Sequence, residues 1–145
     1  MAEFDVDFSS IDNLIRSLED MDLFNEDMQS KLLNAGADHL MDTIKKEASG
    51  SKYRLIHISS KLSKSRKIKK DKNGNYFTSV TVTGKNERGE RNATVAFVLN
   101  YGRSEKYGKI EGSYYWTRAV KRTEKSLQGV YEDIVTEELN ERGLT

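Results

Sequence analysis

The sequence contains no cysteine and no proline in 145 residues. Without cysteine, disulfides, thiolate metal sites and cysteine nucleophiles are excluded. Without proline, long uninterrupted helices are favoured, because proline breaks the helical hydrogen-bond ladder. Apolar residues are also scarce, at 36% of the chain, against about 45–50% in a typical domain on a count that includes glycine. We therefore expect long solvated helices, a disordered stretch or a fold that partner subunits complete.

Long apolar runs are missing as well. No stretch approaches the roughly 18 apolar residues that a membrane-spanning helix needs. The acidic start, residues 1–5, lacks the basic region and apolar run of a signal peptide. These features predict a soluble protein that is intracellular at synthesis and makes no membrane contact.

Charge is balanced in total but segregated along the chain, with 24 Lys+Arg against 23 Asp+Glu. Residues 1–42 contain eleven acids and two bases, whereas residues 45–72 contain eleven bases and two acids. Residues 129–145 are acidic again, with five acids and one base. Such blocks are typical of self-complementary or ring-forming surfaces.

Apolar spacing predicts three helices. The first follows Ser9 and Ser10 and carries its apolar residues at positions 11, 14, 15 and 18. The second begins after a cap at Asn25, runs for about 24 residues and stops at Ser49-Gly50. A third, long helix begins after a cap at Ser113 and ends at Gly143.

Two segments read as strands. Residues 76–83 follow an Asn-Gly turn signal and have one apolar face, which predicts a half-buried strand. Residues 93–101 form a nearly continuous apolar run, which we interpret as a central strand covered on both faces. Residues 55–58 fit either a short strand or a helical turn, and the basic residues 61–70 are expected to form an exposed loop.

The predicted fold class is α+β: a small antiparallel β-sheet packed by a long C-terminal helix, with an N-terminal helical region. We expect one domain, 1–145. Its parts are N-terminal helices over 1–50, a basic loop region over 51–75, the sheet over 76–112 and the C-terminal helix over 113–143.

Catalytic chemistry finds little support. His39 has acidic neighbours but lacks the further ligands that a metal site needs, and His57 lies between two isoleucines. Phosphate-binding glycine loops and nucleophile-elbow motifs are missing from the sequence. We expect no enzyme, no cofactor and no metal.

The basic segment 61–72 has two possible functions. Its side chains could neutralise the phosphates of a nucleic acid, which gives salt-dependent binding, although aromatic residues for base stacking only flank it. Alternatively, it faces an acidic patch on a neighbouring subunit, such as residues 1–42 of another copy. Under either reading, the residues expected to make electrostatic contact are Lys64, Arg66, Lys67, Lys69 and Lys70.

Aromatic residues gather where the last helix opens. Tyr114, Tyr115 and Trp116 either anchor that helix on the sheet or form an interface hot spot, since Tyr, Trp and Arg are enriched in such spots. Both roles can hold for different side chains. Together with Tyr101, these three residues are the predicted interface packing set.

The order of these features resembles the phage neck and tail-component family of long-tailed bacteriophages and prophages. Four features carry the resemblance over residues 10 to 140. The N-terminal helical region ends in Ala48-Ser49-Gly50, and the basic segment Lys61-Leu62-Ser63-Lys64-Ser65 follows. The apolar run 95–102 ends in the pair Tyr101-Gly102, and the last helix opens with the aromatic segment 114–119.

The resemblance implies a non-enzymatic virion part that acts in head–tail connection or tail completion. Similar proteins form rings, commonly hexameric, at the head–tail junction. The implied partners are further copies of this chain, the neighbouring head-connector and tail proteins, and DNA passing through the ring. The implied location is the virion neck or tail, with the host cytoplasm during assembly. The alternative is a small nucleic-acid-binding module that uses segment 61–72.

Overall fold

A computed structural model describes residues 3–6, 12–20, 22, 24–51, 53, 55–65, 68–74, 76–104, 108–141 and 143. Within them the chain forms, in order, β1 (Glu3–Val6), α1 (Asp12–Asp20), α2 (Glu26–Ser49), α3 (Ile56–Ser60), β2 (Leu62–Lys64), β3 (Lys69–Lys70), β4 (Tyr76–Val82), α4 (Asn92–Tyr101), β5 (Gly102–Arg103), β6 (Ile110–Glu111) and α5 (Tyr115–Glu141). The predicted α+β class is confirmed: helices dominate and lie with a small antiparallel sheet.

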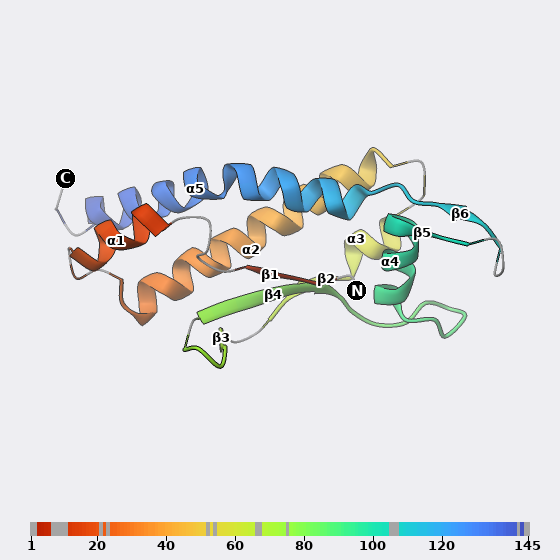
Figure 1. Ribbon diagram of the computed structural model, residues 1–145, viewed down its shortest axis with the longest axis horizontal. Helices are drawn as coiled ribbons and strands as arrows, with labels where there is room; N and C mark the ends of the chain where they lie inside the picture. The colour runs from red at the N-terminus through yellow and green to blue at the C-terminus, as the bar shows by residue number, and fades with distance from the viewer. Residues whose placement is uncertain are drawn as a thin grey trace.

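Helices α2 and α5 lie side by side and form the long axis of the molecule (Figure 1). Helix α2 begins at the predicted residue, because the Asn25 side chain accepts a hydrogen bond from the Met28 N–H at 2.9 Å. It ends at Ser49, before Gly50, and spans 24 residues. The prediction for this helix is confirmed at both ends.

Two apolar clusters hold the long helices in place. The larger one lies between α2, β4, α4 and the start of α5, and includes Leu40, Ile44, Val80 and Trp116. The smaller one joins α1 to the first turns of α2 and the last turns of α5. Its buried members are Leu18, Met28, Leu32, Leu127, Tyr131 and Val135.

Strand β4 is the centre of the sheet. It pairs antiparallel with β1 (Phe4 opposite Val80), with β2 (Lys64 opposite Val80) and with β3 (Lys70 opposite Tyr76). Thr78, Val80 and Val82 on its apolar face are buried, as predicted. The side-chain hydroxyl of Thr78 has no hydrogen-bond partner among the described residues.

The prediction of a second strand over 93–101 is wrong, because these residues form helix α4. Its buried residues are Asn92, Ala96 and Asn100, which recur every fourth position and therefore share one helical face. A continuous apolar run has no period of its own to separate helix from strand. The sheet consequently does not extend over 76–112.

The basic region is more structured than the expected loop. Residues 56–60 form α3, so the helical alternative for this segment is confirmed, and β2 and β3 both add to β4. Beyond α4, a short antiparallel hairpin of β5 and β6 extends from the same end of the molecule (Figure 1).

Candidate subunit interface at helix α4

Helix α4 buries two polar residues and leaves two aromatic residues exposed, while Ala93, Val95 and Leu99 pack against the core from half-buried positions. Two of its three buried residues, Asn92 and Asn100, are amides. Every position from 93 to 101 that is not buried is apolar, with the exception of Thr94. A helix that is apolar on nearly all sides normally lies inside a protein. Here Phe97 and Tyr101 remain exposed, and an exposed apolar patch is a candidate surface for a partner.

One flank of α4 carries an exposed aromatic patch formed by Phe97, Tyr101 and Tyr114. These side chains are 39%, 52% and 49% exposed. The rings of Phe97 and Tyr101 lie 4.9 Å apart, and those of Tyr101 and Tyr114 meet edge to face at 6.4 Å. The three rings therefore form one continuous apolar surface. Phe97 was missed by the sequence reading, because its segment was interpreted as a buried strand.

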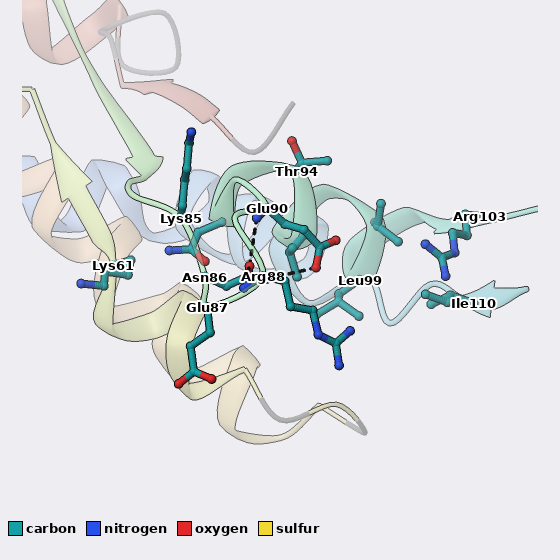
Figure 2. A pocket seen from close by; sticks show the side chains of 13 residues that line it. Lys61, Lys85, Asn86, Glu87, Arg88, Glu90, Thr94, Leu99, Arg103 and Ile110 are labelled. Carbon is teal, nitrogen blue, oxygen red and sulfur yellow. Dashed lines mark hydrogen bonds between the residues drawn. The ribbon is translucent and has the colours of Figure 1, made fainter. Parts of the chain in front are cut away.

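The other flank of α4 opens onto a depression of about 680 Å³. Val95, Val98 and Leu99 from α4 and Ile110 from β6 supply its apolar lining. Its charged lining consists of the bases Lys61, Lys85, Arg88 and Arg103 and the acids Glu87 and Glu90. Figure 2 shows that these side chains come from the C-terminal end of α3, from the loop before α4 and from the β5–β6 hairpin. The depression is thus apolar at α4 and predominantly basic around it.

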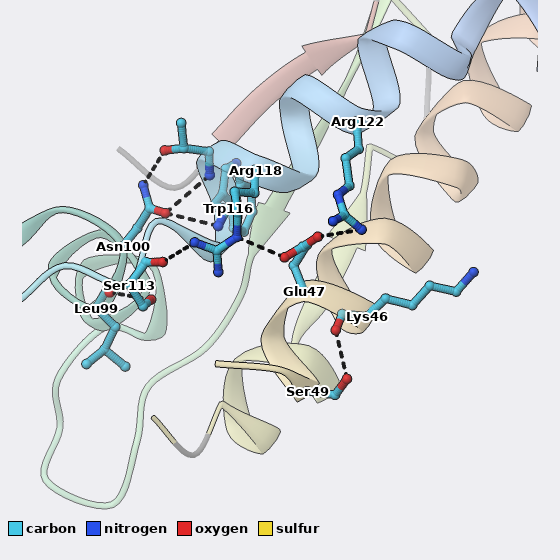
Figure 3. Close-up of polar contacts among 10 residues, drawn as sticks. Lys46, Glu47, Ser49, Leu99, Asn100, Ser113, Trp116, Arg118 and Arg122 are labelled. Carbon is cyan, nitrogen blue, oxygen red and sulfur yellow. Dashed lines mark hydrogen bonds and ion pairs between the residues drawn. The ribbon is translucent and has the colours of Figure 1, made fainter. Parts of the chain in front are cut away.

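Asn100 fixes the start of α5 beside α4 (Figure 3). Its Oδ1 atom accepts hydrogen bonds from the N–H groups of Trp116 at 2.9 Å and Thr117 at 3.2 Å, and its Nδ2 atom donates to Thr117 Oγ1 at 2.9 Å. These are the bonds that an N-terminal cap normally makes, supplied here from another helix. The expected cap, Ser113, instead donates its hydroxyl hydrogen bond to the Leu99 carbonyl at 2.8 Å.

Glycine allows the chain to pass closely between α4 and α5. Gly102 has φ of 84° and ψ of −179°, a conformation reserved for glycine. A Cβ atom there would lie 2.5 Å from the Ile110 carbonyl oxygen, and one at Gly112 would lie 2.6 Å from the Asn100 carbonyl oxygen. The exposed ring of Tyr114 rests on a backbone with φ of 55°, which is strained for a bulky residue. Such strain tends to be retained at functional surfaces.

Tyr115 and Trp116 are buried in the protein's own core, at 0% and 6% exposure. The Tyr115 hydroxyl donates a hydrogen bond to the Ala96 carbonyl at 3.1 Å, and burial raises its pKa. For these two residues the geometry supports the anchoring role rather than an interface role. Tyr101 and Tyr114 are the two members of the predicted packing set that lie on the surface.

The predicted electrostatic set is divided in the structure. Lys64 forms an ion pair with Asp38 of the same chain at 2.9 Å. Lys69 and Lys70 are exposed on β3, with their amino groups 6.0 Å and 5.4 Å from the ring centres of Phe77 and Tyr76. Arg66 and Lys67 lie outside the described residues.

Within the part of the chain that the structure describes, no group of three or more His, Cys, Asp or Glu is placed to hold a metal ion, and no helix is long and apolar enough to cross a membrane. His39 Nε2 lies 2.6 Å from Ser126 Oγ, joining α2 to α5. The side chain of His57 lies outside the description.

The comparisons with known proteins found no match. This holds for models of protein families, for curated proteins and for solved structures.

Proposed function

We propose that this protein is a self-assembling structural subunit, in which helix α4 is covered by another copy of the chain. The observation that carries the proposal is the exposure of Phe97 and Tyr101 on a helix whose buried residues include Asn92 and Asn100. Burying apolar surface drives association. A second copy that covers α4 would therefore remove the exposed apolar surface of this helix from water and stabilise the assembly.

Within that class, we propose a component of the phage neck or tail, assembled as a ring at the head–tail junction. The ordered features of the sequence resemble that family, whose members commonly form hexamers. The low apolar content of the chain, 36%, supports a subunit whose surface is completed by neighbours. Its role would be head–tail connection or tail completion, in the virion and without enzymatic chemistry.

The aromatic patch gives the direct test. Replacing Phe97 and Tyr101 by serine removes two exposed rings, and exposed positions have little influence on folding. Loss of hot-spot aromatics costs about 2 kcal/mol or more, so the concentration at which copies associate should rise by about tenfold or more. A control at another surface is Lys121→Ser with Lys125→Ser, which changes two exposed residues of α5 away from the patch.

A second variant separates assembly from folding. Tyr114→Gly removes the third ring and relieves the backbone conformation at φ of 55°. We expect unchanged or slightly higher stability towards urea together with weaker association. Equal association of wild type and both patch variants would contradict the proposal.

Nucleic-acid binding remains the second candidate, and β3 favours it. The structure sets the exposed Lys69 and Lys70 beside the rings of Phe77 and Tyr76, which combines cationic and aromatic groups as single-strand binders do. Under this candidate, Lys69→Glu with Lys70→Glu abolishes DNA binding, and the affinity of the wild type falls steeply with salt. A DNA titration at two salt concentrations tests it.

A further inference from the structure

We propose that α4 of one copy docks on the acidic groove between α2 and α5 of a second copy, so that subunits join head to tail. This inference rests on the proposed self-assembly and adds which surface of the neighbour is contacted. The two surfaces lie at opposite ends of the long axis, with α4 and the β5–β6 hairpin at one end and α1 with the end of α5 at the other (Figure 1).

The α4 end presents apolar groups flanked by bases. The aromatic patch lies on one side of the helix, and the depression with Lys85, Arg88 and Arg103 lies on the other. Lys85 and Arg88 are exposed, and the structure shows no ion pair for either with another described residue. Their charges are therefore available to a partner.

The opposite end presents a groove of the complementary kind. It has a volume of about 530 Å³, and Ala35 of α2 and Ile134 of α5 supply apolar lining. Carboxylates line it as well, and two of them already have a partner in the chain: Glu138 pairs with Lys31 at 2.5 Å, and Asp38 pairs with Lys64. The remaining carboxylates, Glu137 and Glu141, are exposed and form no ion pair with another described residue.

Acids outnumber bases in the sequence of the elements at this end. Residues 12–31 and 129–141 together contain eleven acids and two bases. Helix α5 has no base in its last turn, so Glu137 and Glu141 lie near the negative end of the helix dipole, where carboxylates are unfavourable. Cations from outside the subunit would relieve this repulsion, and the basic flank of α4 is the complementary surface that the same chain offers.

A contact between two different surfaces of identical subunits is heterologous. It repeats from copy to copy and closes into a ring when the rotation between neighbours permits. A contact of α4 with α4 would instead give a two-fold dimer that needs no acidic end. Head-to-tail docking therefore agrees with the proposed ring and makes a distinct prediction about which charges matter.

Charge exchange tests this docking. The first variant carries Lys85→Glu and Arg88→Glu, and the second carries Glu137→Lys and Glu141→Lys. Each places like charges across the contact, so each alone should associate about tenfold or more weakly than wild type. Mixed in equal amounts, the two variants again present opposite charges at every contact, and association should return. The control, Lys121→Glu with Lys125→Glu, makes the same charge change on the exposed face of α5 between the two ends.

The outcomes separate the two proposals. If the wild type associates and only the mixture restores association, head-to-tail docking is supported. If the wild type associates but the charge variants behave like it, or the mixture stays dissociated, docking is overturned and self-assembly stands. If the wild type stays at 16.6 kDa throughout, both proposals are overturned. Should a double variant fail to fold by circular dichroism, the single changes Arg88→Glu and Glu141→Lys are mixed instead, with the same outcomes.

Discussion

Asn100 offers the sharpest test of how the fold holds its aromatic surface in place. The side chain is 2% exposed and makes three hydrogen bonds to the first turn of α5. Each such bond contributes about 1 kcal/mol net. Asn100→Ala removes all three bonds and leaves two backbone N–H groups without their acceptor. It should therefore lower the free energy of unfolding by about 3 kcal/mol.

Asn92 is the matched control on the same helix face. It is 3% exposed and makes one side-chain hydrogen bond to another described residue, from Nδ2 to the Thr83 carbonyl at 2.9 Å. Asn92→Ala should cost about 1 kcal/mol. Asn100→Asp should fall between wild type and Asn100→Ala, since it keeps the acceptor for the helix N–H groups and removes the donor.

Urea unfolding followed by circular dichroism, at one protein concentration for all variants, measures these differences from the transition midpoints. A loss for Asn100→Ala that equals the loss for Asn92→Ala would refute the reasoning, because the cap on α5 would then contribute nothing.

Three further predictions concern stability. Gly102→Ala should destabilise the protein more than Gly89→Ala does, because both glycines have positive φ but only Gly102 has backbone atoms within 3 Å of the added Cβ. Thermal unfolding of both variants measures the difference. Equal losses of about 1–2 kcal/mol, the conformational cost alone, would contradict the prediction. Burial raises the pKa of Tyr115 above its usual 10.0, so the folded protein binds this proton more tightly than the unfolded chain does. The resulting contribution to the free energy of unfolding is complete below pH 10. It is lost as the pH rises further, by up to about 1.4 kcal/mol per pH unit. Urea unfolding at pH 9 and 11 should show that Tyr115→Phe loses less stability over this interval than wild type, and an equal loss would be the contrary result. Thr123→Val should raise stability by about 1 kcal/mol, since the buried Thr123 hydroxyl has no hydrogen-bond partner among the described residues; a lower melting temperature would show that the hydroxyl is satisfied.

The sequence predicts the long helices well, because their signals are local. Asn25 marks the start of α2 through a side-chain cap that acts within one turn, and the helix ends just before Gly50. The apolar face of β4 is equally local, since alternate residues point to opposite sides.

Helix α4 shows where sequence reasoning fails. Its residues 93–101 are nearly all apolar, and such a run is also what a buried strand requires. What distinguishes the helix is the spacing of Asn92, Ala96 and Asn100, and the two amides make sense only once Thr83 and Thr117 are seen beside them. These contacts join residues that are distant in the sequence, and they orient α4. The sequence alone therefore does not predict which aromatic side chains of α4 are exposed.

The candidate interface was predicted in part. Tyr101 and Tyr114 lie on the surface, while Tyr115 and Trp116 do not. The helical spacing of the segment did not separate them, because the cap from Asn100 sets how α5 begins and so which of its aromatic rings point inward.

The most direct test of the account is the solution mass of the wild type, measured by light scattering over about a hundredfold range of concentration, because self-association depends on concentration through mass action. If α4 is covered by another copy, the mass should rise to a discrete multiple of 16.6 kDa, and the Phe97→Ser, Tyr101→Ser variant should reach it only at higher concentration. A mass of 16.6 kDa at every concentration would contradict the central claim.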